Sequence, residues 1–492
     1  MVASVPALEP GRNCWRIEHA SAANVIVDAD DYFRICRDAM KKAEHQILLI
    51  GWDFDARIRL VQDDEDEAPG EVGAFLDWLI ARKPGLHVNI LRWDTGALKS
   101  LARGRTMLTL ARWWWHKRIH LKLDRFHPAG ASHHQKIVVI DDCLAFCGGI
   151  DMTDDRWDTR AHRDKEPDRV EPGGNAYGPW HDATTALTGP VAKALGELCR
   201  DRWTRAGGSP LPVPPATEPR WPETLPRAFE NCDVAISRSF PAMPDQQPIR
   251  EIEQLYLDLI ARAEHWIYAE SQYFASRRIA EAIGKRLEEP DGPEIVIVNP
   301  VKADGWLEQE AMDSARARLL RVLQNNDPHG RLGVFHAETA GGNPIYIHAK
   351  VTVIDGQILR VGSSNFNNRS LRLDTECDVT IDSTRGANSG CADAVAHVAH
   401  DLIAEHLGSD ADRVKAVLAE TGSLLATIER LAGTGRRLRR YRLPEINAVE
   451  SWLADNEILD PEGPEEMFEP ISKRGLFRRL RRRRNRKSRS KR

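Results

Sequence analysis

One short motif occurs twice in this chain of 492 residues, and it limits the fold more than any other feature. The first copy is HQKIVVID, which begins at His134, and the second is HAKVTVID, which begins at His348, 214 residues later. A second pair of matching stretches, AEHQILLIGWDF (43–54) and AEHWIYAESQYF (263–274), lies 220 residues apart. Two pairs of matches at nearly the same spacing indicate a domain-sized internal repeat. We therefore expect two halves of one architecture.

Each half alternates helical and strand patterns. Amphipathic stretches at 30–43 and 251–263 lead into the matching stretches 43–54 and 263–274, and each is followed by a short apolar run. The runs IVVI (137–140) and VTVI (351–354) are typical of strands buried on both faces. This alternation predicts an α/β fold with a mixed sheet.

The repeat also suggests domain boundaries. A segment rich in Pro and Gly, residues 207–226, reads as a linker between an N-terminal half (1–206) and a C-terminal half (227–445). Helical patterns after about residue 393 close the second half. Residues 446–492 form an extension, whose last twenty residues hold thirteen Lys or Arg and no acid. Such a block cannot bury a core, and we expect it to be disordered when free.

The repeated His-x-Lys suits phosphate chemistry. Histidine titrates near neutral pH, so His134 and His348 could act as a nucleophile and an acid on opposite sides of a phosphorus atom. Lys136 and Lys350 beside them would attract the anion. A lone histidine before a strand is usually a hydrogen-bonded structural residue, but two complete copies favour the chemical interpretation. We count the aspartates that end the motifs, Asp141 and Asp355, with the catalytic set and expect them to brace it.

A glycine turn follows each copy and offers polar backbone groups: CGGID (147–151) and VGSSN (361–365). We expect Gly149, Ser363 and Asn365 to bind phosphate oxygens.

The two motifs resemble the paired HKD motifs of the phospholipase D superfamily, and most closely the eukaryotic type. The likeness also includes GGIDMTDDRWD (148–158), YGPWHD (177–182), ESQYF (270–274) and GSSNFNNRSLRLDTE (362–376). It implies two similar α-β-α sandwich halves packed as one bilobal unit, with a single active site at their interface. It also implies a phosphohistidine intermediate and no cofactor or catalytic metal.

The resemblance assigns roles to single residues. His134 would be the nucleophile, and His348 the acid that protonates the leaving alcohol and then activates water. Asp182 and Glu376 match acids that hydrogen-bond the far nitrogens of the histidines, and the sequence does not show which acid serves which histidine. Asp151 stands where the second copy has Asn365.

Three other features invite a metal or membrane interpretation. The acidic stretch 151–168 fits no EF-hand spacing and reads as a solvated loop. Adjacent histidines 133 and 134 point apart on a strand, which argues against zinc. The tryptophans of RWWWHKR (112–118) could lie at a membrane interface or pack in the core.

The leading functional prediction is a phospholipase D that hydrolyses a glycerophospholipid to phosphatidic acid and an alcohol. The alternatives are a cardiolipin synthase-like phosphatidyltransferase and, less favoured, a nuclease of the same superfamily.

Without the tail the chain carries a net charge of −17, so we do not expect a nucleic acid partner. We expect a monomer in the cytoplasm that attaches peripherally to anionic phospholipid through its basic tail, since no apolar run approaches the roughly 20 residues that span a bilayer. The sequence leaves open export without a cleaved signal.

Overall fold

The computed structural model describes residues 8–63, 66–94, 109, 112–113, 115–218, 220–244, 246–302 and 306–443, with the backbone alone over 306–314. The predicted basic tail lies outside the described residues.

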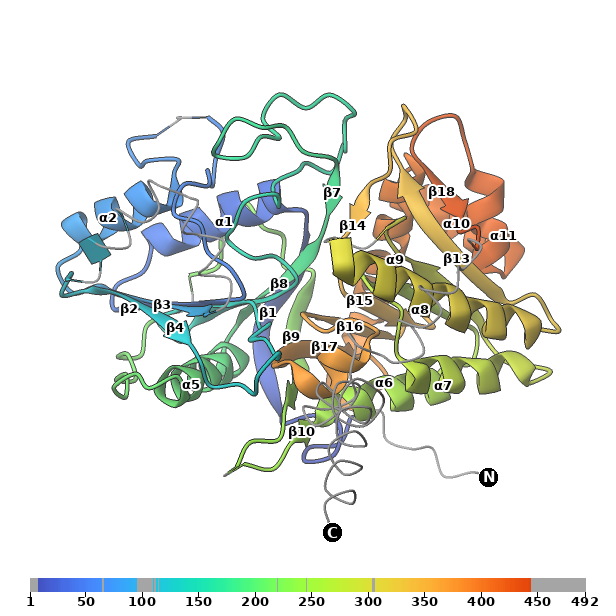
Figure 1. Cartoon of the computed structure of the whole chain (residues 1–492), viewed down its shortest axis with the longest axis horizontal. Coiled ribbons are helices and arrows are strands. Elements are labelled where there is room, and N and C mark those ends of the chain that lie inside the picture. The colour runs from blue at the N-terminus through green and yellow to red at the C-terminus, as the bar shows by residue number, and fades with distance from the viewer. Residues whose placement is uncertain are drawn as a thin grey trace, which may run out of the picture.

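Strands from both halves join one mixed β-sheet (Figure 1). Its order is β18-β13-β12-β11-β15-β16-β17-β9-β1-β8-β6-β5-β2-β3-β4, with β10 paired to β9. The N-terminal strands are β1 (Arg16–Val27), β2 (Gln46–Gly51), β3 (His87–Trp93), β4 (Ile119–Asp124), β5 (Ile137–Ile140), β6 (Leu144–Gly148) and β8 (Ala183–Thr188). The C-terminal strands are β9 (Phe229–Phe240), β10 (Ile249–Arg250), β11 (Trp266–Glu270), β12 (Glu294–Val298), β13 (Leu332–Glu338), β15 (Val351–Ile354), β16 (Ile358–Gly362), β17 (Glu376–Asp382) and β18 (Arg437–Arg440). A separate two-stranded parallel sheet joins β7 (Trp180–His181) to β14 (Tyr346–Ile347).

The two halves of the sheet mirror one another about β1 and β9. These two long strands pair antiparallel over Arg16–Ala23 and Phe229–Ile236, in the middle of the sheet. Outward from them, β8, β6, β5, β2 and β3 follow on one side, and β17, β16, β15, β11 and β12 on the other. The strands that carry the repeated sequences, β2 and β5, therefore have β11 and β15 as their counterparts.

Helices cover both faces of each half. They are α1 (Ala29–Lys41), α2 (Val72–Arg82), α5 (Pro190–Arg205), α6 (Glu251–Arg262), α7 (Arg277–Glu288), α8 (Trp306–Asn325), α9 (Ala392–Leu407), α10 (Ala411–Thr421) and α11 (Leu424–Leu431), with a π-helix at Arg369–Leu373 and a 3-10 helix at Gly386–Cys391. Because successive residues of a strand face opposite sides, Val138 and Ile140 pack with α1 and α2 while Ile137 and Val139 pack with α5. No helix among the described residues is long and apolar enough to cross a membrane.

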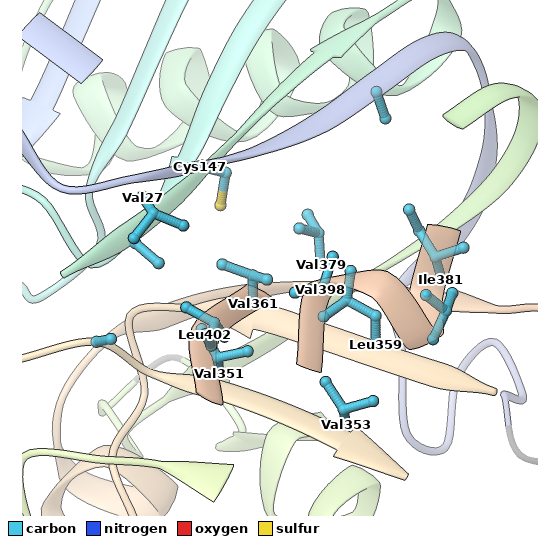
Figure 2. Close-up of a cluster of buried hydrophobic side chains, with 14 of the residues drawn as sticks. Val27, Cys147, Val351, Val353, Leu359, Val361, Val379, Ile381, Val398 and Leu402 are labelled. Carbon is cyan, nitrogen blue, oxygen red and sulfur yellow. The ribbon is translucent and has the colours of Figure 1, made fainter. Parts of the chain in front are cut away.

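One of the buried apolar clusters extends across both halves (Figure 2), while two others lie mainly within the first and the second half. Val27 and Cys147 of the first half face Val351, Val361 and Val379 of the second half in the shared cluster. The predicted α/β class is confirmed by this mixed sheet. The sheet does not divide into two separate sandwiches, because β1 and β9 join the halves edge to edge.

Candidate active site

Both motif histidines lie just before a strand and are fixed by the opposite half of the chain. The backbone N–H of His134 donates to the carbonyl of Thr375 at 2.9 Å. The backbone N–H of His348 donates to the carbonyl of His181 at 2.8 Å. The parallel pairing of β14 with β7, and a matching bridge between His133 and Thr375, produce these two contacts. Each histidine is thus held beside the segment of the other half that carries an acid, Glu376 for His134 and Asp182 for His348.

The acids pair with the histidines in a crossed arrangement. Nδ1 of His134 lies 3.0 Å from both carboxylate oxygens of Glu376, 242 residues away. Nδ1 of His348 lies 2.6 Å from Oδ2 of Asp182. A carboxylate accepts from Nδ1–H, which leaves Nε2 of each ring free for chemistry. The structure therefore shows the pairing that the sequence left open.

Two residues expected to bind phosphate have other partners in the protein, and both expectations are corrected: Ser363 holds Glu376, and Gly149 leaves room for Asp182. The Ser363 hydroxyl is buried and donates to Glu376 at 2.5 Å, and it accepts the backbone N–H of Cys377. The Gly149 amide donates to the Ala183 carbonyl at 2.8 Å. A Cβ at Gly149 would lie 2.1 Å from a carboxylate oxygen of Asp182, so glycine is required for the close approach of that acid.

The two lysines have unequal surroundings. Each ammonium group donates to the carbonyl of its own histidine, Lys136 to His134 and Lys350 to His348. Lys136 also lies 3.2 Å from the Asp151 carboxylate. For Lys350, no carboxylate within ion-pair distance occurs among the residues described. The surroundings differ because the first copy has the carboxylate of Asp151 where the second copy has the amide of Asn365.

Asp151 and Asn365 occupy equivalent positions. Oδ1 of Asp151 accepts the backbone N–H of Trp52 at 3.0 Å, and Oδ1 of Asn365 accepts that of Gln272 at 3.2 Å. Because its oxygen is used in this way, Asn365 can offer a phosphate only its amide hydrogens. Its predicted phosphate-binding role stays a prediction.

The aspartates that end the motifs are far from the histidines. Each follows the far end of its strand, seven residues beyond the histidine, or roughly 20 Å along an extended chain. Asp141 accepts the backbone N–H groups of residues 44–46. Asp355 does the same for residues 264–266. Their placement in the catalytic set is corrected, and the bracing that we expected fits these contacts.

Burial and neighbouring cations favour neutral histidine rings. Burial lowers the pKa of His134 well below 6.5, and Lys136 and Lys350 lower it further. The pKa of His348 is also lowered well below 6.5, first by burial, then by Lys350, Arg156 and Lys136. Each ring is thus influenced by a lysine of the other half, as expected where two motifs converge on one site. Burial raises the pKa of Glu376 to about 7.

Aromatic rings surround the histidines, and our sequence reasoning gave them no role. The Trp180 ring centroid lies 5.1 Å from that of His348 and stacks on Tyr346 at 4.5 Å. The Arg156 guanidinium lies 4.4 Å from the centroid of Trp180. On the other side, Trp52 lies edge-on to His134, with centroids 6.5 Å apart. Their spacing in the sequence could have identified them, because Trp180 stands two residues before Asp182 and Tyr346 two residues before His348.

Two other expectations have clear outcomes. The stretch 151–168 is solvated only in part: residues 163–165 are exposed, but Asp158 and His162 are buried and paired with each other at 3.1 Å. In RWWWHKR, Trp113 is 1% exposed in the core, whereas Trp115 is 86% exposed. His133, next to the motif, is also buried, and its ring contacts Gln135.

The chain is similar in sequence to several known proteins. A family model described as "Cardiolipin synthase, PLD-like domain" matches residues 256–399. Phospholipase D alpha 1 of Zea mays is 24% identical, over 68% of this chain and 58% of the relative. Phospholipase D alpha 4 of Arabidopsis thaliana is 22% identical, over 70% of this chain and 59% of the relative. The chain thus spans less than two thirds of the length of these relatives.

A solved structure supports the fold. The crystal structure of phosphatidylserine synthase from Haemophilus influenzae Rd KW20 superposes with a TM-score of 0.53 at 14% sequence identity. The match covers 89% of this chain and 94% of that chain. The arrangement of helices and sheet described above is therefore shared with a protein of very different sequence.

Proposed function

Because the chain belongs to the phospholipase D superfamily, we propose that it hydrolyses a glycerophospholipid to phosphatidic acid and the head-group alcohol. The observation that carries this proposal is the crossed pairing of His134 with Glu376 and of His348 with Asp182. It presents two neutral imidazoles from opposite halves, each with a fixed tautomer and a free Nε2.

The proposed reaction has two displacement steps. Nε2 of His134 attacks the phosphorus atom, and the bond from phosphorus to the head-group oxygen breaks. His348 supplies the proton that this oxygen takes up. Water, deprotonated by His348, then breaks the phosphorus–nitrogen bond and releases phosphatidic acid. We assign the nucleophile to His134 because its side chain is 16% exposed, against 6% for His348.

To act as an acid, His348 must be protonated on both ring nitrogens, and the free protein favours the neutral ring instead. Burial, Lys350 and Arg156 hold the pKa of His348 well below 6.5. A bound phosphodiester brings a negative charge next to this ring, and an opposite charge raises the pKa of an imidazole. Substrate binding would therefore favour the protonated form of His348, which can act as the acid.

Phosphatidyl transfer is the second candidate. The description of the matching family model, a cardiolipin synthase domain, favours it. The covalent step is the same, and only the acceptor differs: an alcohol takes the place of water in the second displacement. Both candidates require access to lipid, which we assign to peripheral binding of an anionic membrane surface by the basic tail.

Product analysis tests the proposal. Full-length protein is incubated in parallel with mixed phospholipid vesicles and with plasmid DNA, with and without 1-butanol, and the products are identified by mass spectrometry. We expect phosphatidic acid from the vesicles, phosphatidylbutanol when the alcohol is present, and intact DNA. Cleaved DNA with unchanged lipid would refute the lipid substrate, and transfer without hydrolysis would favour the second candidate.

A further inference from the structure

A second cluster of histidines and carboxylates lies beneath the candidate active site. Asp28 follows β1, His162 lies in the loop after β6, His181 ends β7, and Glu405 belongs to α9. One nitrogen or oxygen atom from each of the four residues lies within 4.8 Å of all the others. All four side chains are buried, and Glu405 comes from the opposite half to the other three.

Hydrogen bonds alone do not satisfy this cluster. Nε2 of His162 lies 3.3 Å from an Asp28 oxygen and 3.0 Å from Oε1 of Glu405. Nδ1 of His181 lies 3.2 Å from the other Asp28 oxygen and 2.9 Å from the same Glu405 oxygen. Oδ2 of Asp28 and Nδ1 of His181 are buried in the cluster without a hydrogen bond of acceptable geometry to any described residue. Two buried polar atoms in one cluster without hydrogen bonds are a costly arrangement unless something else binds them.

The distances suit a four-coordinate cation. Nitrogen and oxygen ligands about 2.0–2.2 Å from a tetrahedral ion lie roughly 3.3–3.6 Å apart. The four contacts between the rings and the carboxylates, at 2.9–3.3 Å, are slightly shorter than these edges. Small movements of the side chains would therefore admit an ion.

The outer nitrogens of both rings are held as in metal sites. Nδ1 of His162 lies 3.1 Å from the Asp158 carboxylate, and Nε2 of His181 lies 2.9 Å from the Glu270 carboxylate. Metal-binding histidines usually donate their second N–H to a carboxylate or carbonyl, which turns the other nitrogen toward the ion.

We propose that Asp28, His162, His181 and Glu405 bind one divalent cation, with zinc as the best fit to two imidazole nitrogens and two carboxylates. Four protein ligands leave no open position, so the ion has a structural role and does not touch substrate. It ties α9 of the second half to the first half. It also fixes the acid that serves His348, because Asp28 accepts the backbone N–H of Asp182 at 3.0 Å. The site does not depend on the proposed lipid activity.

Metal analysis of full-length, tag-free protein tests the proposal. The protein is supplied in turn with zinc, manganese and ferrous iron, desalted, and measured by inductively coupled plasma mass spectrometry. We expect about one zinc ion per wild-type chain and at least a tenfold lower content in Asp28→Asn and His162→Gln. His19→Gln is the matched control, because His19 is exposed and lies 3.9 Å from Asp233 in a surface pair; it should retain the ion.

Wild-type protein with less than about a tenth of an ion per chain, or undiminished metal in both ligand variants, would overturn the proposal. The cluster would then be a network of charged rings and carboxylates. If the variants do not fold, X-ray absorption of the wild type decides the question. Nitrogen and oxygen ligands at about 2.0–2.1 Å with scattering from two imidazoles would support the site, and sulfur ligands or no imidazole would refute it.

Discussion

At the scale of single residues, the site depends on two acids that never need to touch substrate. Glu376 and Asp182 are 0% exposed, and each contacts Nδ1 of one histidine. An amide in place of either acid could donate to Nδ1 and favour the wrong tautomer, so that the proton would reside on Nε2. We expect Glu376→Gln and Asp182→Asn each to lower kcat by roughly two to four orders of magnitude.

Steady-state kinetics on a short-chain phospholipid measures this loss, with circular dichroism to show that the fold is kept. Asp201→Asn, at an exposed position of α5, is the control and should behave as wild type. More than a tenth of wild-type kcat in either acid variant would contradict the positioning role.

The pH dependence should reflect Lys350. Burial lowers the pKa of this ammonium group from 10.5 to about 7. Because the pKa is lowered, the charge is lost as the pH rises through about 7, and kcat/KM should fall above that pH. Bound phosphate would restore the charge, so kcat should hold its plateau to higher pH. A profile of kcat/KM from pH 5 to 9 measures this.

Lys350→Arg separates charge from position. Guanidinium stays protonated throughout this range, so the alkaline fall should disappear even if the maximal rate is lower. An unchanged alkaline midpoint in this variant would assign the fall to another group.

At the scale of elements, close packing of neighbouring segments sets the geometry of the acids. Gly149 follows β6, and a methyl group there would collide with the Asp182 carboxylate. We expect Gly149→Ala to displace this acid from His348 and to lower kcat at least tenfold, with a loss of stability of about 1–3 kcal/mol from overpacking. Gly178→Ala is the control, because a Cβ at Gly178 meets no atom within 4 Å. Activity and thermal unfolding of both variants check this, and equal activities would show that Asp182 tolerates the shift.

At the scale of the whole molecule, the two halves share one sheet and one of their apolar clusters. The β1–β9 pairing and the apolar cluster that holds Val27, Cys147 and Val361 belong to both halves at once. We therefore expect one cooperative thermal transition, with equal calorimetric and van't Hoff enthalpies. Residues 1–206 expressed alone should not fold, because one edge of β1 and the core face would be uncovered. Two resolved transitions in differential scanning calorimetry would mean that the halves are independent.

The basic tail is proposed to bring the whole molecule to its substrate. Each Lys or Arg near an anionic surface contributes about 1 kcal/mol, and salt screens this attraction within about 8 Å at physiological ionic strength. Full-length protein should sediment with anionic vesicles at low salt and be released as salt rises. A chain that ends at Ile471 should bind poorly and still cleave dispersed short-chain lipid at a near-normal rate. Equal sedimentation of both chains would exclude the tail as the anchor.

The sequence by itself determined the repeat, the α/β class and the pairs of His and Lys, because these depend on local periodicity and on a motif written twice. Only the tertiary structure decided which acid serves which histidine, since Glu376 and His134 meet across 242 residues through strands of opposite halves. It also changed the role of Ser363 from phosphate binding to holding Glu376, and that of Gly149 to leaving room for Asp182. It showed Asp158 and His162 to be buried, in an acidic stretch that we expected to be solvated. The physical reason is the same in each case. A polar residue's role depends on the partners that enclose it, and here those partners come from another strand, from the other half of the chain or from a loop that no periodicity describes.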